Sequence, residues 1–352
     1  MSRNWFMKAA ALALSVGILA GCGGAANQTP QDGGNQTPAG QEEQFAVGMV
    51  TDLGGLNDQS FNQSAWAGLK RLESEKGFKV QAVESKRQED YDTNFQVLVD
   101  QDFDLIWGIG SLMGDAIKAK AEQLPDVKFA IVDSDVTAPN LAGVTFREEE
   151  GSFLMGVIAA KTTKTGKVGF IGGMDIDVIH HFEAGYKAGV KATDPNVEVV
   201  TVYSGTFTDS NKGKSDALAM YGQGVDVIFH ASGNTGTGVI EAAKEVNKYA
   251  IGVDQDQNYL APDNVISSMM KDVKGAVYDI SVAAAEGKFP GGQVTVLGLK
   301  EGRVGYSDST LWDKMPEGTK ELVDKWADAI RTGKVTVPNS REALESWEVP
   351  QI

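Results

Sequence analysis

Short apolar segments alternate with amphipathic segments from residue 44 onward, and this alternation restricts the fold more than any other property of the chain. A first set of β-rich runs occupies residues 44–52, 78–85, 103–110 and 128–135. A second set occupies residues 167–174, 197–205, 225–232 and 249–256. Near-continuous apolar strands separated by amphipathic helices are typical of parallel βαβ units with helices on both faces of the sheet. The sequence therefore predicts an α/β protein with two similar doubly wound lobes.

The segments after the second set fit neither series. They comprise residues 264–271, a helix from about 273 to 287, and two short β-rich runs at 294–299 and 302–308. We expect them to cross back between the lobes and to form a hinge of several strands. The expected lobes are residues 44–145 plus about 268–292 at the N-terminal side, and about 146–267 plus about 293–352 at the C-terminal side.

The first 22 residues are organised like an export signal. A basic start precedes an apolar run from Ala9 to Ala20, and the segment ends in Leu19-Ala20-Gly21-Cys22. These last four residues resemble a bacterial lipobox, which implies a signal peptide of residues 1–21, cleavage before Cys22 and diacylation of its thiol. The alternative is a spare thiol beside an ordinary secretory cleavage site.

Residues 22–43 read as a flexible tether. They contain Asn-Gln-Thr-Pro twice, at 27–30 and 35–38, and they have no apolar periodicity. Such a composition cannot bury enough apolar surface to offset the entropy of ordering. We therefore expect a protein held on the extracytoplasmic side of a bacterial cell membrane, with acylated Cys22 in the lipid bilayer.

Composition argues against several classes of function. The formal charge is −16 and no run of Lys and Arg occurs, so a nucleic-acid partner is not expected. Three histidines and one cysteine leave little for a zinc site. Gly213-Lys214-Ser215 has the end of a P-loop without its first glycine, and no Gly-x-Ser-x-Gly elbow occurs. We expect no cofactor, no metal and no catalysis, and we interpret His180 and His181 as residues that decorate a helix start.

Polar residues follow the apolar strands at the edge where open parallel sheets bind ligands. They are Asp52, Gly110, Ser111, Asp133, Asp135, Gly172, Gly173, Asp175, Gly233, Asn234, Asp254 and Asp256. Acids, amides and glycines dominate this set, and Lys271 is the basic exception. Such a lining mainly accepts hydrogen bonds, so it favours a small ligand rich in hydroxyl and NH donors over an anion.

Four segments carry a family resemblance. "MVTDLGGLNDQSFNQSAWAGL", "HHFEAGYKAG", "GVDQDQ" and "SSMMKD" occur in this order between about residues 45 and 310. They resemble the basic membrane protein family of nucleoside-binding lipoproteins, which are substrate-binding components of ABC importers. The resemblance implies a type I periplasmic-binding-protein fold with two Rossmann-like lobes, joined by a hinge of several crossovers. It also implies a monomer that grips a purine nucleoside in the interlobe cleft and delivers it to ABC permease subunits in the membrane.

The resemblance also implies roles for single residues. Residues of the first motif would bind the edge of the base and stack on its face; they are Asp52, Asn57, Asp58, Ser60, Phe61 and Asn62. Phe182 matches a second stacking aromatic from the opposite lobe. Contacts to the ribose hydroxyls and nearby atoms would come from Asp133, Gly233, Asp254 and Lys271. Between Asp254 and Asp256 we prefer Asp254, because it comes first after its strand.

Structural roles for the same residues remain open at this point. Phe61 begins a stripe with Ala65, Leu69 and Leu72 at the spacing of a helix core face, and Phe182 has a similar place in its own helix. Capping of the following helix can be the whole role of Asn57 and Asp58. Lys271 with Asp254 can be an ordinary ion pair, and Asp133 can cap a turn.

Two other functions also remain open. One is a receptor of the same fold for a sugar or another small polar ligand, because sugars also stack on aromatic rings. The other is an exported nucleoside hydrolase.

Overall fold

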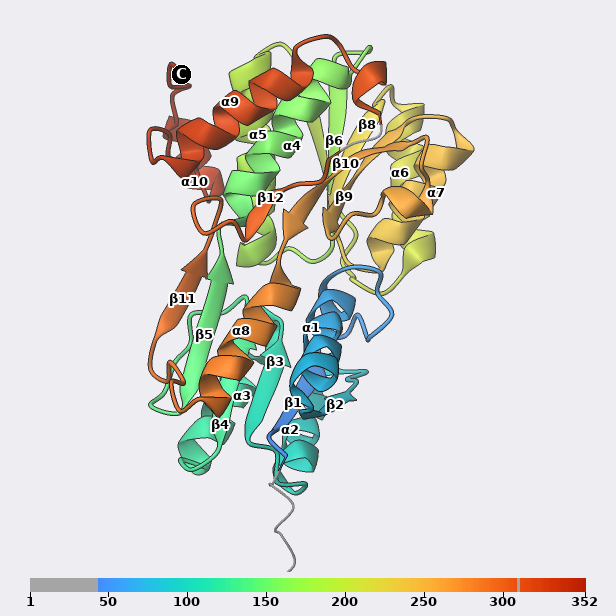
Figure 1. Ribbon diagram of the computed structural model, residues 1–352. Helices are drawn as coiled ribbons and strands as arrows, with labels where there is room; N and C mark the ends of the chain where they lie inside the picture. Colours follow the sequence, from blue (N-terminus) through green and yellow to red (C-terminus); the bar gives the residue numbers. More distant parts are fainter. Residues whose placement is uncertain (1–43, 309–310) are drawn as a thin grey trace, which may run out of the picture. The chain divides into compact units, whose positions relative to one another are not determined.

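Each predicted lobe contains one six-stranded sheet, and the two sheets have equivalent strand orders (Figure 1). The computed structural model describes residues 44–308 and 311–352. The predicted signal peptide, the tether and Cys22 lie outside the described residues. Within the described residues, no helix combines the length and the hydropathy that a bilayer crossing requires.

The first sheet is entirely parallel, and both of its faces are covered. Its strands, in order across the sheet, are β11 (Val294–Leu297), β5 (Leu141–Phe146), β4 (Lys128–Val132), β3 (Leu105–Ile109), β1 (Ala46–Thr51) and β2 (Lys79–Val83). Its helices are α1 (Phe61–Lys76), α2 (Tyr91–Val99), α3 (Gly114–Gln123) and α8 (Val273–Ala285), with 3-10 turns η1 (Gln88–Asp90) and η2 (Ser111–Met113). Successive side chains of β1 pack into two separate apolar clusters, Met49 into one and Val50 into the other. This arrangement is the doubly wound α/β architecture that the apolar strands predict.

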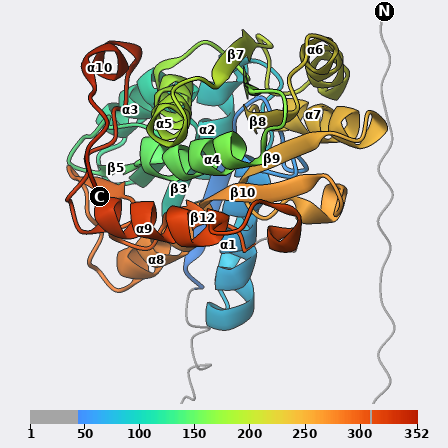
Figure 2. The same ribbon diagram turned by 90° about the horizontal axis from the view of Figure 1, so that it is seen from above.

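The second sheet repeats this order with one antiparallel edge strand. Its strands are β12 (Val304–Tyr306), β10 (Val265–Lys271), β9 (Tyr249–Asp254), β8 (Val227–Ala231), β6 (Lys167–Gly172) and β7 (Glu198–Tyr203), and β12 is the antiparallel one. Its helices are α4 (Glu148–Thr162), α5 (Asp177–Thr193), α6 (Ser210–Gly222), α7 (Thr235–Glu245), α9 (Thr319–Arg331) and α10 (Arg341–Ser346), with 3-10 turns η3 (Asn258–Leu260) and η4 (Trp312–Lys314). In the view from above, α4 lies between α5 and α9 (Figure 2).

Two glycines bring α4 and α5 into close contact. A Cβ atom on Gly156 would lie 2.1 Å from the carbonyl oxygen of Tyr186, and one on Gly189 would lie 2.0 Å from that of Phe153. No side chain fits at such distances, so these backbones touch without intervening side chains. The N-terminal end of α4 is held against α5 in the same way, because a Cβ atom on Gly185 would lie 2.2 Å from the carbonyl oxygen of Glu149. The N-terminal ends of both helices carry residues of the site described below.

The eight strands predicted from the two β-rich sets are all present, and the doubly wound fold is confirmed. The expected lobe ranges differ from the structure at two crossings. Residues 268–271 belong to β10 in the second sheet, because β10 pairs with β9 and β12 as far as Lys271. Residues 294–297 form β11 in the first sheet, where Val294 pairs with Gly143 of β5. The chain therefore passes between the lobes after β5, after β10 and after β11, which is the predicted hinge of several crossovers.

Candidate functional site

A cleft lies between the two lobes, where the carboxyl ends of the parallel strands meet. It holds about 590 Å³ of empty space, counting its open mouth. Nine of the residues predicted for the site line it: Asp52, Asp58, Phe61, Asn62, Asp133, Phe182, Gly233, Asp254 and Lys271. Asn57 and Ser60 do not line it. Asn57 is exposed in the turn before α1, whereas Ser60 is buried and contacts a cleft residue.

Asp58 organises the turn from which α1 begins. One carboxylate oxygen accepts hydrogen bonds from the backbone N–H groups of Ser60 (2.9 Å) and Gln63 (3.1 Å). The other accepts from the backbone N–H of Asn62 (2.8 Å) and from its side-chain amide (3.0 Å). Both oxygens are thus occupied by groups of the same turn, as for a helix-capping residue. Asp58 therefore holds Asn62 in place and has little capacity left for a ligand.

Asn62 joins Asp58 to Asp52 at the base of the cleft. Its amide nitrogen donates to Oδ1 of Asp52 (2.7 Å), which also accepts from the N–H of Gly54 (2.8 Å). Asp52 is nearly buried, and this burial raises the pKa of its carboxyl to about 6 despite the hydrogen bonds from Asn62 and Gly54. The first strand of the fold and the first turn of α1 are therefore connected through one polar chain that faces the cleft.

Phe61 is less buried than the other members of the helical stripe that it begins. Ala65, Leu69 and Leu72 are fully buried, as the helical spacing predicts. Phe61 is only partly buried and lines the cleft. It occupies the first turn of α1, where it packs at the margin of the apolar core and also borders the cleft. The structure therefore places this ring where a ligand can contact it.

Lys271 is a fully buried cation at the end of β10. Its Nζ lies 2.7 Å from Oδ2 of Asp133 in the first lobe and 2.9 Å from Oε1 of Glu148 at the start of α4. Burial acts to lower the pKa of Lys271, but the neighbouring carboxylates outweigh it and raise the pKa above its ordinary value. The same ammonium lies between 5.1 and 5.4 Å from the ring centres of Phe61, Phe146 and Phe182. One charge thus connects both lobes and three aromatic rings.

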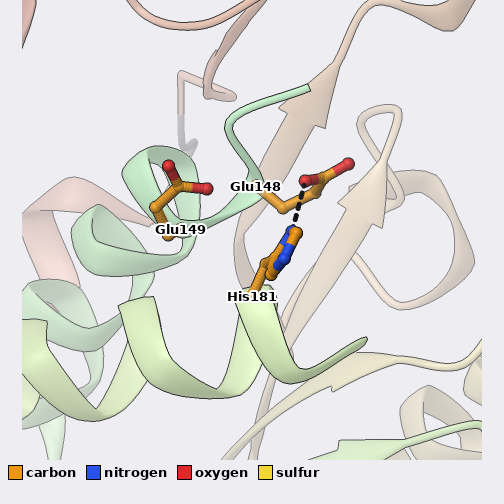
Figure 3. Close-up of side chains that lie close together, drawn as sticks. All are labelled: Glu148, Glu149 and His181. Atoms are coloured by element: carbon orange, nitrogen blue, oxygen red, sulfur yellow. Dashed lines mark hydrogen bonds and ion pairs between the residues drawn. The ribbon is translucent and has the colours of Figure 1, made fainter. Parts of the chain in front are cut away.

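Glu148 was not found by the sequence analysis, and it also contacts His181. Its Oε2 lies 3.4 Å from Nδ1 of His181 on α5, as Figure 3 shows. Burial alone would raise the pKa of Glu148, but Lys271 and His181 together hold it below its usual value. The interpretation of His181 as mere decoration of a helix start is therefore incomplete. The acidic triplet 148–150 directly after a strand was the available signal for Glu148.

Glu148, Glu149 and His181 also present ligand atoms that lie within 4.8 Å of one another. Figure 3 draws a contact between Glu148 and His181 and none from Glu149 to either of them. A metal ion bound by Glu148 would face the ammonium of Lys271, which already lies 2.9 Å from its carboxylate. Like charges at such a distance repel strongly in a buried site. We therefore interpret this group as an ion-pair network that holds Lys271.

Asp133 and Asp254 end their strands in the same unusual backbone conformation. Their φ angles are +64° and +67°, in the left-handed region that residues other than glycine seldom adopt. Burial raises the pKa of Asp133 to about 6 and that of Asp254 to about 7. Asp256, the alternative to Asp254, is exposed and does not line the cleft. Unfavourable backbone geometry together with buried acids is a frequent property of binding sites.

The second lobe contributes a wall of apolar side chains and one glycine. Phe182 is 3% exposed and lies 6.4 Å, between ring centres, from Phe229. Phe207 follows β7, is only partly buried and also lines the cleft, although the sequence analysis did not select it. The available signal was its place four residues beyond the last residue of that strand, but the sequence analysis considered polar residues there. Gly233 has a φ of +55° and packs against Phe207.

Direct hydrogen bonds connect the two lobes beside the turn that Asp58 organises. The buried side chain of Gln257 donates from Nε2 to the carbonyl oxygen of Gln59 (2.9 Å), and the hydroxyl of Tyr259 donates to Oε1 of Gln59 (2.6 Å). The hydroxyl of Ser60 donates to Oδ2 of Asp254. Residues 59 and 60 of the first lobe are therefore held by the second lobe beside the cleft.

Comparison with known proteins identifies the family. Residues 45–337 match the model of the family described as "ABC transporter substrate-binding protein PnrA-like". The chain belongs to this family. It is thus a substrate-binding protein of an ABC transporter, a class of proteins that are not enzymes, and the resemblance found in the four motifs is confirmed.

Individual PnrA-like and related proteins cover nearly the same length. The chain is 40% identical to the ABC transporter nucleoside-binding protein BmpA of Lactococcus lactis over 92% of this chain and 96% of that protein. It is 41% identical to basic membrane protein A of Borreliella burgdorferi, over 86% of this chain and 90% of that one. Among solved structures, an ABC transporter solute-binding protein of Aeropyrum pernix superposes with a TM-score of 0.78 at 29% identity, covering 86% of this chain and 96% of the other. The type I periplasmic-binding-protein fold is thereby confirmed.

Proposed function

We propose that this protein is a lipid-anchored receptor that binds a purine nucleoside in the interlobe cleft and delivers it to an ABC importer. The observation that carries the proposal is the pairing of two kinds of groups in one cleft: aromatic rings from both lobes and buried carboxylates around Lys271. A nucleoside has the matching two parts, a flat base and a ribose with adjacent hydroxyls. The related protein of Lactococcus lactis is named as nucleoside-binding.

The base would stack on Phe61 and on a ring of the second lobe. Stacking of one base on one aromatic side chain contributes about 1–3 kcal/mol. Phe182 was selected for the second ring, but it is already almost fully buried, whereas Phe207 is partly buried and has more surface to offer. Rings from opposite lobes would couple binding to lobe closure, because neither lobe alone supplies both faces.

The ribose would lie against Asp133, Asp254 and Lys271. Hydroxyl groups donate well to ionised carboxylates, and such charge-assisted hydrogen bonds are about twice as strong as neutral ones. Oδ1 of Asp133 is buried without a hydrogen-bond partner among the described residues, and Oδ2 of Asp254 accepts only from Ser60. Gly233 would allow the ligand to approach the backbone closely, since it has no side chain.

The remaining parts of the proposal concern the setting. Acylation of Cys22 would anchor the chain to the outer side of the cell membrane, and the tether of residues 22–43 would let the lobes reach the permease subunits. We propose that the receptor acts as a monomer and needs no cofactor or metal.

Isothermal titration of the purified protein with purine nucleosides, free ribose and galactose tests the proposal. We expect adenosine, guanosine or inosine to bind at micromolar concentration or below, and the sugars to bind much more weakly. Sugar binding without nucleoside binding would establish the sugar-receptor alternative. The protein is also incubated with inosine, and the products are separated by chromatography. Release of free hypoxanthine would establish a hydrolase instead.

The choice of the second ring is tested by two variants. Phe207→Ala and Phe182→Ala differ in what they remove, because the first ring is partly exposed to the cleft and the second is packed in the core. If Phe207 stacks on the base, Phe207→Ala weakens nucleoside binding with little change in unfolding free energy. Phe182→Ala should then destabilise the protein, as the loss of a buried ring does.

A further inference from the structure

The part of the cleft lined by Asp52 and Asn62, where the base is proposed to bind, presents hydrogen-bond acceptors to a ligand. The side-chain amide of Asn62 donates both of its N–H bonds, one to Asp52 (2.7 Å) and one to Asp58 (3.0 Å). Two carboxylates on this side fix the orientation of the amide, because a carboxylate can only accept. The oxygen of Asn62 therefore points away from them.

That oxygen is buried and has no hydrogen-bond partner among the described residues. A buried acceptor without a donor is costly in a folded protein, and native structures seldom keep one without a function. Asn62 also lines the cleft. The unpaired oxygen is thus an independent indication that a ligand donates a hydrogen bond at this point.

Asp52 supplies a second acceptor beside it. Its Oδ1 is occupied by Gly54 and Asn62, while no described residue donates to its Oδ2. Asp52 lines the cleft next to Gly110, and a Cβ atom on that glycine would lie 3.4 Å from Oδ2. The absence of a side chain at Gly110 leaves this oxygen accessible.

We propose that Oδ1 of Asn62 and Oδ2 of Asp52 form an acceptor pair that selects a base with two neighbouring N–H donors, which among the common purines is guanine. This inference rests on the proposed nucleoside function and adds the choice of base. Guanine carries N1–H and the 2-amino group side by side. Hypoxanthine has N1–H but no 2-amino group, and adenine has an acceptor at N1.

The energetic reason is the cost of leaving an acceptor unpaired. With hypoxanthine one of the two oxygens lacks a donor, and with adenine a ring nitrogen faces a carboxylate. Sites built to hydrogen-bond a polar group discriminate strongly against analogues that lack it, because their own buried groups then remain unpaired. We expect guanosine to bind at least about tenfold more tightly than inosine and adenosine.

The variant Asp52→Asn tests directly whether a hydrogen-bond acceptor at this position selects guanine. It preserves the shape and leaves an oxygen for the N–H of Gly54 and the amide of Asn62, and it places an NH₂ group where Oδ2 was. Guanosine affinity should fall at least about tenfold, while adenosine, whose N1 now meets a donor, should lose less or gain. The ratio of guanosine to adenosine affinity should therefore fall by about tenfold or more.

Asp133→Asn is the matched control, because it makes the same chemical change at the ribose end. It should weaken all three nucleosides to a similar degree and leave their ranking unchanged. Titration calorimetry of the wild type and both variants with guanosine, inosine and adenosine supplies every value, and urea unfolding verifies that the variants are folded.

The outcomes separate the two proposals. Equal affinity of the wild type for the three nucleosides, or an Asp52→Asn variant that weakens all three alike, overturns the selection of guanine and leaves the receptor function intact. If the wild type binds none of the three, the receptor function itself fails. The wild-type ranking remains decisive even if Asp52→Asn does not fold.

Discussion

Replacing Lys271 with methionine should destabilise the protein strongly, and more at high pH than at low pH. The ammonium is the cation between the buried carboxylates of Asp133 and Glu148, at 2.7 and 2.9 Å. Removal of one partner from a buried ion pair costs about 3–5 kcal/mol, because the other charge is left without compensation. Here two carboxylates are left, so we expect a loss of about 4–5 kcal/mol near pH 8.

The dependence on pH follows from the carboxylates. Burial already raises the pKa of Asp133 to about 6, and without Lys271 it should rise further. The pKa of Glu148, which Lys271 and His181 hold below its usual value, should also rise when Lys271 is removed. A carboxyl whose folded pKa lies above its unfolded pKa destabilises the folded state when it is ionised, and protonation removes that cost. The loss in Lys271→Met should therefore shrink as the pH falls from about 8 to about 5.5.

Urea unfolding at both pH values measures the effect. Lys314→Met is the control, because Lys314 pairs with Asp263 at 3.2 Å on the surface, where the two side chains are 52% and 85% exposed. Exposed ion pairs contribute little to stability. If Lys271→Met is no more destabilising than Lys314→Met, or loses the same free energy at both pH values, the ion-pair account of the cleft is wrong.

Three further predictions concern binding. Burial raises the pKa of Asp254 to about 7, so calorimetry should show nucleoside affinity falling as the pH is lowered from 8 to about 6. Urea unfolding of the free protein should show stability rising as the pH is lowered from 8 to about 6.5, and opposite slopes would refute the ribose-binding role of Asp254. Phe61→Ala should weaken nucleoside binding about 10- to 100-fold in calorimetry with little loss of stability, and the reverse pattern would restore its core role. Tyr259→Phe removes the hydrogen bond to Gln59, so stopped-flow fluorescence should show a ligand dissociation rate constant about 2- to 5-fold higher. Tyr278→Phe is the control and should leave this rate constant unchanged, because the hydroxyl of Tyr278 contacts only the first lobe.

The sequence predicted the elements of this fold well because periodicity is a local property. The eight apolar runs predicted as strands are all strands, and the residues that follow Phe61 in its stripe form a buried helix face. The swap of residues 268–271 and 294–297 between the lobes was not predictable in the same way. A strand of a hinge can pair with either sheet, and only the tertiary register decides which one it joins.

The candidate site was predictable where a residue ends a strand, and less so where a contact connects distant elements. Asp52, Asp133 and Asp254 follow from the strand-end rule. Glu148 and Gln257 do not, because their roles depend on partners 123 and 198 positions away, Lys271 and Gln59. Asp58 shows the opposite case: its motif predicts a ligand contact and it lines the cleft, but the hydrogen bonds that its oxygens accept within its own turn could not be predicted from that motif.

The position of β11 has a consequence for the order in which the chain is synthesised. The first sheet contains β1 to β5 early in the chain, but its edge is completed only by residues 294–297. Until that strand has been made, β5 has an open edge that can pair with another chain. We expect truncated or stalled chains that end before residue 294 to aggregate even though nearly all of the first lobe is present. Synthesis must therefore reach about the last sixth of the chain, where β11 lies, before the open edge of the first sheet is covered.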